Sequence, residues 1–153
     1  MIEKGDFVLM DYGAGYCDYR SDMTRTVVMG EPTQEQLDLY ALVRRTHEEC
    51  VAAIHPGVEG NDIFKLSKKI IGDAGYGDYY NHGLGHGVGI DIHELPNFNR
   101  SKNIIEVGSV VTMEPGVYLP GVGGVRLEDY GVVTENGYEP FTKTPHDLHI
   151  IDC

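Results

Sequence analysis

Glycine occupies every second position in one short stretch of this chain, and that pattern limits the local fold more than any other feature. The stretch "NHGLGHGVGIDIHELP" spans residues 81–96 and has glycine at positions 83, 85, 87 and 89. Glycine disfavours a helix and packs no side chain, because it loses more backbone freedom on folding than other residues. The pattern therefore predicts an extended strand whose backbone lies close to another part of the molecule or to a ligand.

Three histidines accompany these glycines: His82, His86 and His93. His82 and His86 have the four-residue spacing of metal ligands on a helix, but the glycines argue against a helix there. The sequence also lacks H-E-x-x-H, since Glu94 is followed by Leu-Pro, and no register gives the phosphate-binding pattern G-x-G-x-x-G. A single histidine is usually an ordinary core or surface residue, whereas three within twelve residues favour a site. We therefore expect this strand to pass beside a metal centre.

The hydrophobic pattern predicts strands at both ends of the chain and two helices between them. Thr33 and Gln36 form a capping-box pattern at the start of the first helix, and Asn61 is the expected cap of the second. Strands are expected at 6–13, 18–30, 109–119, 124–135 and 136–142, and helices at 31–57 and 61–75. This order is that of an α+β protein without βαβ alternation, and we expect one domain over residues 1–153.

The two predicted hairpins each bring two carboxylates face to face. With the first hairpin centred between residues 16 and 17, Asp11 lies opposite Asp22, and with the second centred on residue 121, Glu114 lies opposite Glu128. Directly opposed like charges destabilise a sheet, and burial increases that cost. A divalent cation is the simplest reason for two such pairs; the alternative is a different register, with the acids in turns or facing water.

The expected ligands indicate which ions would bind. Four carboxylates and one imidazole are mostly hard donors, which suit Mn²⁺, Co²⁺ or Fe²⁺ and also admit Zn²⁺. Four negative charges balance two divalent cations. Two ions about 3.5–4 Å apart, bridged by carboxylates and water, form a hydrolytic centre in which the bridging hydroxide is the nucleophile.

Composition narrows the functional class. The formal charge is −12, from 24 acidic against 12 basic residues, which argues against nucleic acid or an anionic membrane as a partner. Cys17, Cys50 and Cys153 are widely spaced without a CxxC motif, so a disulfide framework or zinc knuckle is not expected. The sequence shows neither an apolar run of about 18 residues nor a signal peptide at its start. A cytoplasmic location is the resulting expectation.

Four ordered motifs resemble the signatures of the M24 metallopeptidases, which have the pita-bread fold. They are "DYGAGYCDYRSDMTRT", "HGLGHGVGIDIHELP", "TMEPGVYLP" and "GGVRLEDYGVV". "SDMTRT" and "GGVRLED" resemble the Xaa-Pro branch, proline dipeptidase and aminopeptidase P, more than the methionine aminopeptidases. The resemblance implies a metal-dependent exopeptidase that uses a dinuclear metal-bound hydroxide, with manganese the first choice. Its substrate would be a peptide with proline at the second position, cleaved before that proline.

The resemblance also assigns roles to individual residues. His82 and His93 would hold the substrate carbonyl and the developing oxyanion, and Arg126 would organise the site. Glu114 would hold the nucleophilic water and shuttle its proton, and Tyr118 is a weaker candidate for the pocket rim. The implied metal ligands are Asp11, Asp22, His86, Glu114 and Glu128. A non-catalytic pita-bread module that binds a peptide or partner is the alternative, although such proteins typically lose metal ligands and this chain keeps all five.

The chain departs from the family in length. Catalytic domains of the family pair two related halves around the site, whereas this sequence starts just before the first metal aspartate. We therefore expect an incomplete pita-bread fold, the C-terminal part of a larger catalytic domain, which could be inactive alone. An apolar face exposed by the missing half would favour a homodimer.

Overall fold

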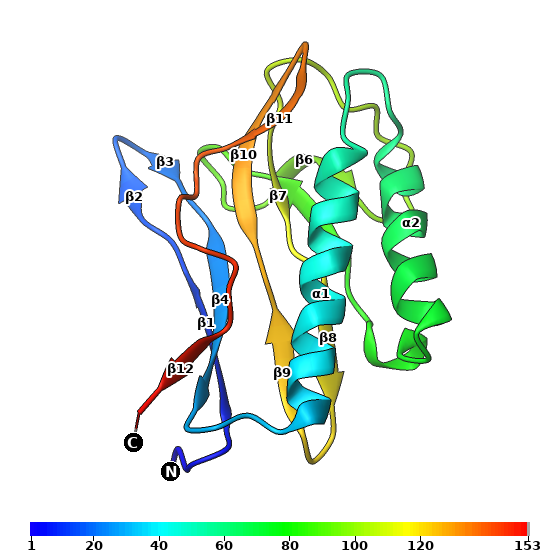
Figure 1. The fold of residues 1–153 in the computed structure, drawn as a ribbon. Coiled ribbons are helices and arrows are strands. Elements are labelled where there is room, and N and C mark those ends of the chain that lie inside the picture. The colour runs from blue at the N-terminus through cyan, green and yellow to red at the C-terminus, as the bar shows by residue number, and fades with distance from the viewer. Residues whose placement is uncertain (153) are drawn as a thin grey trace.

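Two helices lie side by side along one face of the strands in the computed structural model, which describes residues 1–152 (Figure 1). The helices are α1 (Gln34–Ala52) and α2 (Gly60–Asp73), followed by a 3₁₀ turn, η1 (Gly77–Tyr79). The strands are β1 (Phe7–Tyr12), β2 (Gly15–Tyr16), β3 (Tyr19–Arg20), β4 (Met23–Met29), β5 (Gly85–Gly87), β6 (Glu94–Phe98), β7 (Val110–Met113), β8 (Gly116–Leu119), β9 (Gly123–Arg126), β10 (Asp129–Thr134), β11 (Gly137–Pro140) and β12 (His149–Ile151). Within residues 1–152, neither helix is both long and apolar enough to cross a bilayer.

The strands form two sheets and two short ribbons. One sheet has the order β1-β4-β12, with β12 parallel to β4, and the other has the order β11-β10-β7-β5-β6. The ribbons are β2-β3 and β8-β9, and β8-β9 continues the β7 and β10 strands beneath α1 (Figure 1). Strands β7 and β8 on one side and β9 and β10 on the other thus form one long ribbon. An isolated bridge between Thr24 and Glu128 joins the start of β4 to this long ribbon. The two predicted hairpins therefore meet at one place in the fold.

Helix α1 begins as the capping-box pattern predicts. The Thr33 side chain accepts a hydrogen bond from the Gln36 backbone N–H, and the Gln36 side chain accepts one from the Thr33 N–H. Leu39, Val43 and Cys50, which recur at helical spacing in the sequence, are all fully buried.

The predicted cap of α2 is wrong by two residues. The helix begins at Gly60 with Glu59 as the N-cap residue, so Asn61 lies inside its first turn. The Gly60 N–H donates to the Asn103 carbonyl, and a Cβ at Gly60 would overlap the Asn97 carbonyl oxygen. Close tertiary packing therefore sets the start of this helix, rather than a capping side chain.

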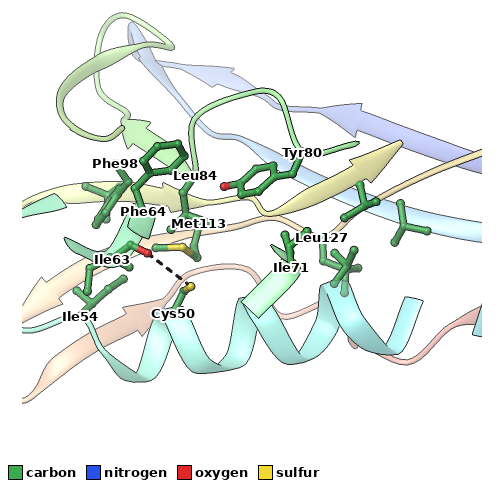
Figure 2. Packing of buried hydrophobic residues seen from close by; sticks show 14 of the residues in the cluster. Cys50, Ile54, Ile63, Phe64, Ile71, Tyr80, Leu84, Phe98, Met113 and Leu127 are labelled. Atoms are coloured by element: carbon green, nitrogen blue, oxygen red, sulfur yellow. Dashed lines mark hydrogen bonds between the residues drawn. The ribbon is translucent and has the colours of Figure 1, made fainter. Parts of the chain in front are cut away.

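The hydrophobic core fills the space between the helices and the sheets. Figure 2 shows Cys50 of α1 with its Sγ pointing at the Ile63 carbonyl oxygen of α2, 4.0 Å away. Burial raises the pKa of the Cys50 thiol to about 12, so this cysteine is a packing residue. Cys17 is exposed, both cysteines are free, and Cys153 lies outside the described residues. The core cluster that contains Cys50 also includes Ile54, Phe64, Ile71, Tyr80, Leu84, Phe98, Met113 and Leu127 (Figure 2).

The register predicted for the first hairpin is wrong. Asp11 pairs with Thr24 and not with Asp22. The turn residues are Cys17 and Asp18, both in the left-handed region with φ of 48° and 69°, so the turn centre lies one residue later than expected. Because strand residues two apart share a face, Asp22 still falls on the Asp11 side of the hairpin.

The register of the second hairpin agrees with the prediction. Gly116 pairs with Arg126 and Met113 with Asp129, which leaves Glu114 and Glu128 opposed between these pairs. Both carboxylates lie where the long ribbon is interrupted, since the Glu114 N–H bonds to Leu84 and the Glu128 N–H to Thr24. The predicted strands 109–119 and 124–135 are therefore each divided in two at a candidate ligand.

Candidate metal centre

Eight of the nine residues singled out from the sequence, all but Tyr118, line one cavity of about 660 Å³. They come from separate parts of the chain: the first hairpin, the glycine stretch and the interrupted ribbon. The eight are Asp11, Asp22, His82, His86, His93, Glu114, Arg126 and Glu128. The fold thus brings together side chains that lie up to 117 positions apart, from residue 11 to residue 128.

The most compact part of the cavity contains Asp22, His86 and Glu128. One ligand atom from each of the three lies within 4.8 Å of the other two. Glu114 joins this group through its Oε1, which is 3.4 Å from His86 Nε2, while Asp22 Oδ2 is 3.7 Å from the same nitrogen. These separations are near those of ligands around shared cations.

The glycine strand allows His86 to reach this cluster. A Cβ at Gly85 would overlap the Thr112 carbonyl oxygen, and one at Gly87 would come within 2.6 Å of the Leu95 carbonyl oxygen. Strand β5 therefore fits between β6 and β7 only with glycine on both sides of His86. The His86 Nδ1–H donates to the Gly87 carbonyl at 3.0 Å, so the lone pair of Nε2 faces the carboxylates.

The charges of the cluster fit a cation. Burial first, and then the neighbouring carboxylates, raise the pKa of Glu114 to about 7 and that of Glu128 to about 8. Burial and the nearby Asp11 also raise the pKa of Asp22. Arg126 approaches Glu114 at 3.9 Å, which offsets only part of this repulsion. The donor set is therefore one that bound divalent ions would stabilise.

Two threonines that sequence reasoning missed hold these ligands in place. Thr24 donates its hydroxyl to Glu128 Oε2 at 2.6 Å and accepts from Arg126 Nε at 3.1 Å. The Thr112 hydroxyl accepts from the His86 N–H at 3.1 Å. The alternation of side chains along a strand could have indicated both residues. Thr24 follows Asp22 by two residues and Thr112 precedes Glu114 by two, so each threonine shares a face with a candidate ligand.

A chain of polar contacts runs from Asp11 along the edge of the cavity. Arg126 forms an ion pair with the half-exposed Asp11 carboxylate and donates to the Tyr118 hydroxyl at 3.2 Å. The His82 Nδ1–H donates to the Gly83 carbonyl at 2.7 Å, which makes Nε2 the acceptor for the Tyr118 hydroxyl at 3.0 Å. Tyr118 thus joins two site residues, but it is not among the residues that line the cavity.

His93 is the exposed histidine of the site. Its ring centroid is 4.3 Å from that of His86, and it also lines a neighbouring hollow with Asp11 and Asp22. An exposed imidazole at the mouth of the cavity is accessible to a bound molecule, in contrast to the half-buried His82.

Comparisons with known proteins agree on one family. The sequence profile of metallopeptidase family M24 matches residues 1–135. The Xaa-Pro dipeptidase of Pyrococcus furiosus is 44% identical over 148 residues, which are 96% of this chain and 42% of that protein. The prolidase structure from Pyrococcus horikoshii has a TM-score of 0.93 and 42% identity, covering 96% of this chain and 43% of that one. The Xaa-Pro dipeptidase structure from Bacillus anthracis has a TM-score of 0.95 and 43% identity, covering 98% and 42%.

These comparisons confirm the predicted α+β pita-bread fold and its incompleteness. The chain spans about two fifths of the length of the curated relatives and solved structures it matches. The activities that those names state therefore belong to whole molecules of which this chain matches only a part.

Proposed function

The chain belongs to metallopeptidase family M24, and we propose that the protein containing it hydrolyses the peptide bond between an N-terminal residue and proline. The observation that carries this proposal is the single cavity lined by all eight site residues. The names of the relatives support the substrate class, since several are Xaa-Pro dipeptidases. Residues 1–153 would form one domain, the C-terminal part of the catalytic domain, and cytoplasmic location and a homodimer stay predictions.

Two divalent cations, manganese first among them, would be held by Asp11, Asp22, His86, Glu114 and Glu128. When bound, they would activate a water molecule as the nucleophile and polarise the scissile carbonyl. The five residues fit this task because their carboxylates are crowded, those of Asp22 and Glu128 are buried, and Arg126 neutralises them only in part. Cobalt, iron and zinc remain chemically admissible ions.

Glu114 is the residue we assign to proton transfer. Its carboxylate lies 3.4 Å from His86 Nε2 and faces the cavity, where it can accept a proton from the attacking water. The same proton can then pass to the prolyl nitrogen as the peptide bond breaks, which leaves a free carboxylate and a secondary amine as products.

The two substrate-side histidines differ in how they can act. The His82 Nδ1–H is engaged by Gly83 and its Nε2 accepts from Tyr118, so it offers a substrate carbonyl no free N–H while it is neutral. Burial lowers the pKa of His82, which favours that neutral form. We therefore assign the carbonyl and oxyanion contact mainly to the exposed His93, and to His82 the positioning of Tyr118 and Arg126.

The experiment is a peptidase assay on the full-length protein, with Mn²⁺ added after chelation. An Ala-Pro dipeptide tests the proposed bond, Ala-Ala is the matched control, and Ala-Pro-Ala separates a dipeptidase from an aminopeptidase. We expect turnover of at least one proline substrate, little turnover of Ala-Ala, and loss of turnover in Glu114→Gln. Equal rates on Ala-Pro and Ala-Ala would reject the proline specificity, and a fully active Glu114→Gln would reject its role.

A further inference from the structure

His47 is an unusual residue in the core of this molecule. It lies on α1 with 2% of its surface exposed, and neither ring nitrogen has a hydrogen-bond partner among residues 1–152. A buried imidazole without partners loses its hydration and gains no hydrogen bond in return, which destabilises the folded chain. A ligand that binds a ring nitrogen of His47 would offset this loss.

Two further candidate ligands lie beside it. His47 Nε2 is 3.5 Å from Asp129 Oδ2, and His146 Nε2 is 2.7 Å from the same oxygen. The two imidazole rings meet edge to face with centroids 4.8 Å apart, and the ligand atoms of all three residues lie within 4.8 Å of one another. Ligands bound at about 2 Å to one tetrahedral zinc ion stand about 3.3 Å apart, close to these separations.

The cluster is separate from the candidate centre described above. Asp129 follows Glu128 directly, so strand alternation turns their side chains to opposite faces, and none of the three residues lines the large cavity. The three ligands come from α1, from the start of β10 and from the segment between β11 and β12. A shared ion would fasten that C-terminal segment to the core.

The two oxygens of the Asp129 carboxylate face different partners, Oδ1 toward Arg25 and Oδ2 toward the two histidines. The Arg25 guanidinium donates to Asp129 Oδ1 at 2.7 Å, while its remaining N–H groups bond backbone carbonyls, among them those of Glu128 and Thr144. Oδ2 is left for the histidines. Because the guanidinium draws charge from the carboxylate, the site should favour a cation that binds imidazole strongly, such as Zn²⁺, over oxygen-seeking ions such as Mn²⁺ or Mg²⁺.

We propose that His47, Asp129 and His146 form a second metal site, selective for zinc-like ions. Both histidines would bind through Nε2, so the ion would replace the hydrogen bond that His146 Nε2 makes to Asp129 Oδ2 at 2.7 Å. Water would take the fourth position from the side of His146, which is 24% exposed at its side chain. His47 needs no deprotonation to bind, since burial lowers its pKa to about 4. The proposal does not depend on peptidase activity.

The test is zinc content by mass spectrometry after dialysis of the intact protein against Zn²⁺ with Mn²⁺ in excess. We expect one zinc per chain more in the parent than in His47→Gln or His146→Gln, and the same zinc in the matched control His55→Gln, whose histidine is exposed. Glu114→Gln should also keep this zinc, which separates the site from the peptidase centre.

A second readout covers the case in which the core variant His47→Gln fails to fold. His146→Gln changes a partly exposed residue, and with Mn²⁺ kept in excess its melting temperature should rise less on addition of Zn²⁺ than that of the parent. Equal zinc content in the parent and His146→Gln would overturn the proposal. So would a crystal structure grown with zinc in which a water molecule, and no metal, bridges His47 and Asp129.

Discussion

The Thr24 hydroxyl lies 2.6 Å from Glu128 Oε2 and donates to it across the join between β4 and the long ribbon. The two residues also exchange backbone hydrogen bonds, with the Glu128 N–H bonding the Thr24 carbonyl at 3.0 Å. This pair holds the first hairpin, with its aspartates, against the second, with its glutamates. The geometry of the candidate metal centre therefore depends on a contact between two strand segments 104 residues apart.

Replacing Thr24 with valine keeps the shape of the side chain but removes the hydroxyl. Glu128 then loses a donor and Arg126 loses an acceptor, both in the buried part of the site. We expect a loss of about 1–3 kcal/mol in the free energy of unfolding of the metal-free protein. Affinity for Mn²⁺ should fall by about 10–100-fold, as for other contacts that orient metal ligands.

Chemical denaturation and Mn²⁺ titration measure these two effects. Thr134→Val is the matched control, because its hydroxyl bonds within the turn to Gly137, away from the site. Unchanged Mn²⁺ affinity in Thr24→Val would show that the pair does not organise the centre.

Alanine should have opposite effects at two glycines, Gly85 of strand β5 and Gly72 of helix α2. Alanine at Gly85 would place its Cβ against the Thr112 carbonyl and force β5 away from β7, with an expected destabilisation of about 1–3 kcal/mol. Alanine at Gly72 of α2 meets no atom within 4 Å and should stabilise the helix by about 0.5–1 kcal/mol. Thermal unfolding compares the two, and a neutral Gly85→Ala would refute the close approach of β5 to β7.

The stability of the metal-free protein should depend on pH through Glu128. Its pKa is about 8 in the folded chain, against an ordinary value near 4.5, so the folded state binds more protons than the unfolded state between these values. The stabilisation that the raised pKa of Glu128 gives the folded state is therefore fully present below about pH 4.5 and is lost as the pH rises through about 8. Relative to Glu128→Gln, the chelated parent should lose melting temperature between pH 5 and pH 8.

Added Mn²⁺ supplies the control for this pH effect. The bound ion would stabilise the ionised carboxylates, so the loss of stability with rising pH should be reduced or reversed in its presence. A difference between parent and Glu128→Gln that stays constant with pH would contradict the buried, crowded state of Glu128.

Much of the fold could be predicted from the periodicity of the sequence and from its cap and turn residues. The Thr33 capping box, the helical spacing of Leu39 and Cys50, and the alternating glycines each reflect local physics that tertiary contacts do not override. The register of the second hairpin followed from the symmetric position of Glu114 and Glu128 about its turn. The residue patterns brought together the four carboxylates and the three histidines of the glycine stretch, the resemblance to the M24 family added Arg126, and all eight residues line one cavity.

The features that were missed depend on long-range contacts or on unusual backbone conformations. The first hairpin turns at Cys17 and Asp18, two non-glycine residues with positive φ, which no common turn pattern indicates. The start of α2 is set by the close approach of Gly60 to the Asn97 backbone. Strand β12 is three residues long and pairs with β4 from the far end of the chain, so its own sequence carries little signal.

The most direct test of the central claim is anomalous scattering at the manganese edge from crystals of the protein grown with Mn²⁺. We predict two peaks inside the cavity, each contacted by carboxylates from both hairpins, with His86 Nε2 bound to one of them. Peaks that are absent from the cavity, or that contact the carboxylates of one hairpin alone, would contradict a shared pair of cations held between the two hairpins.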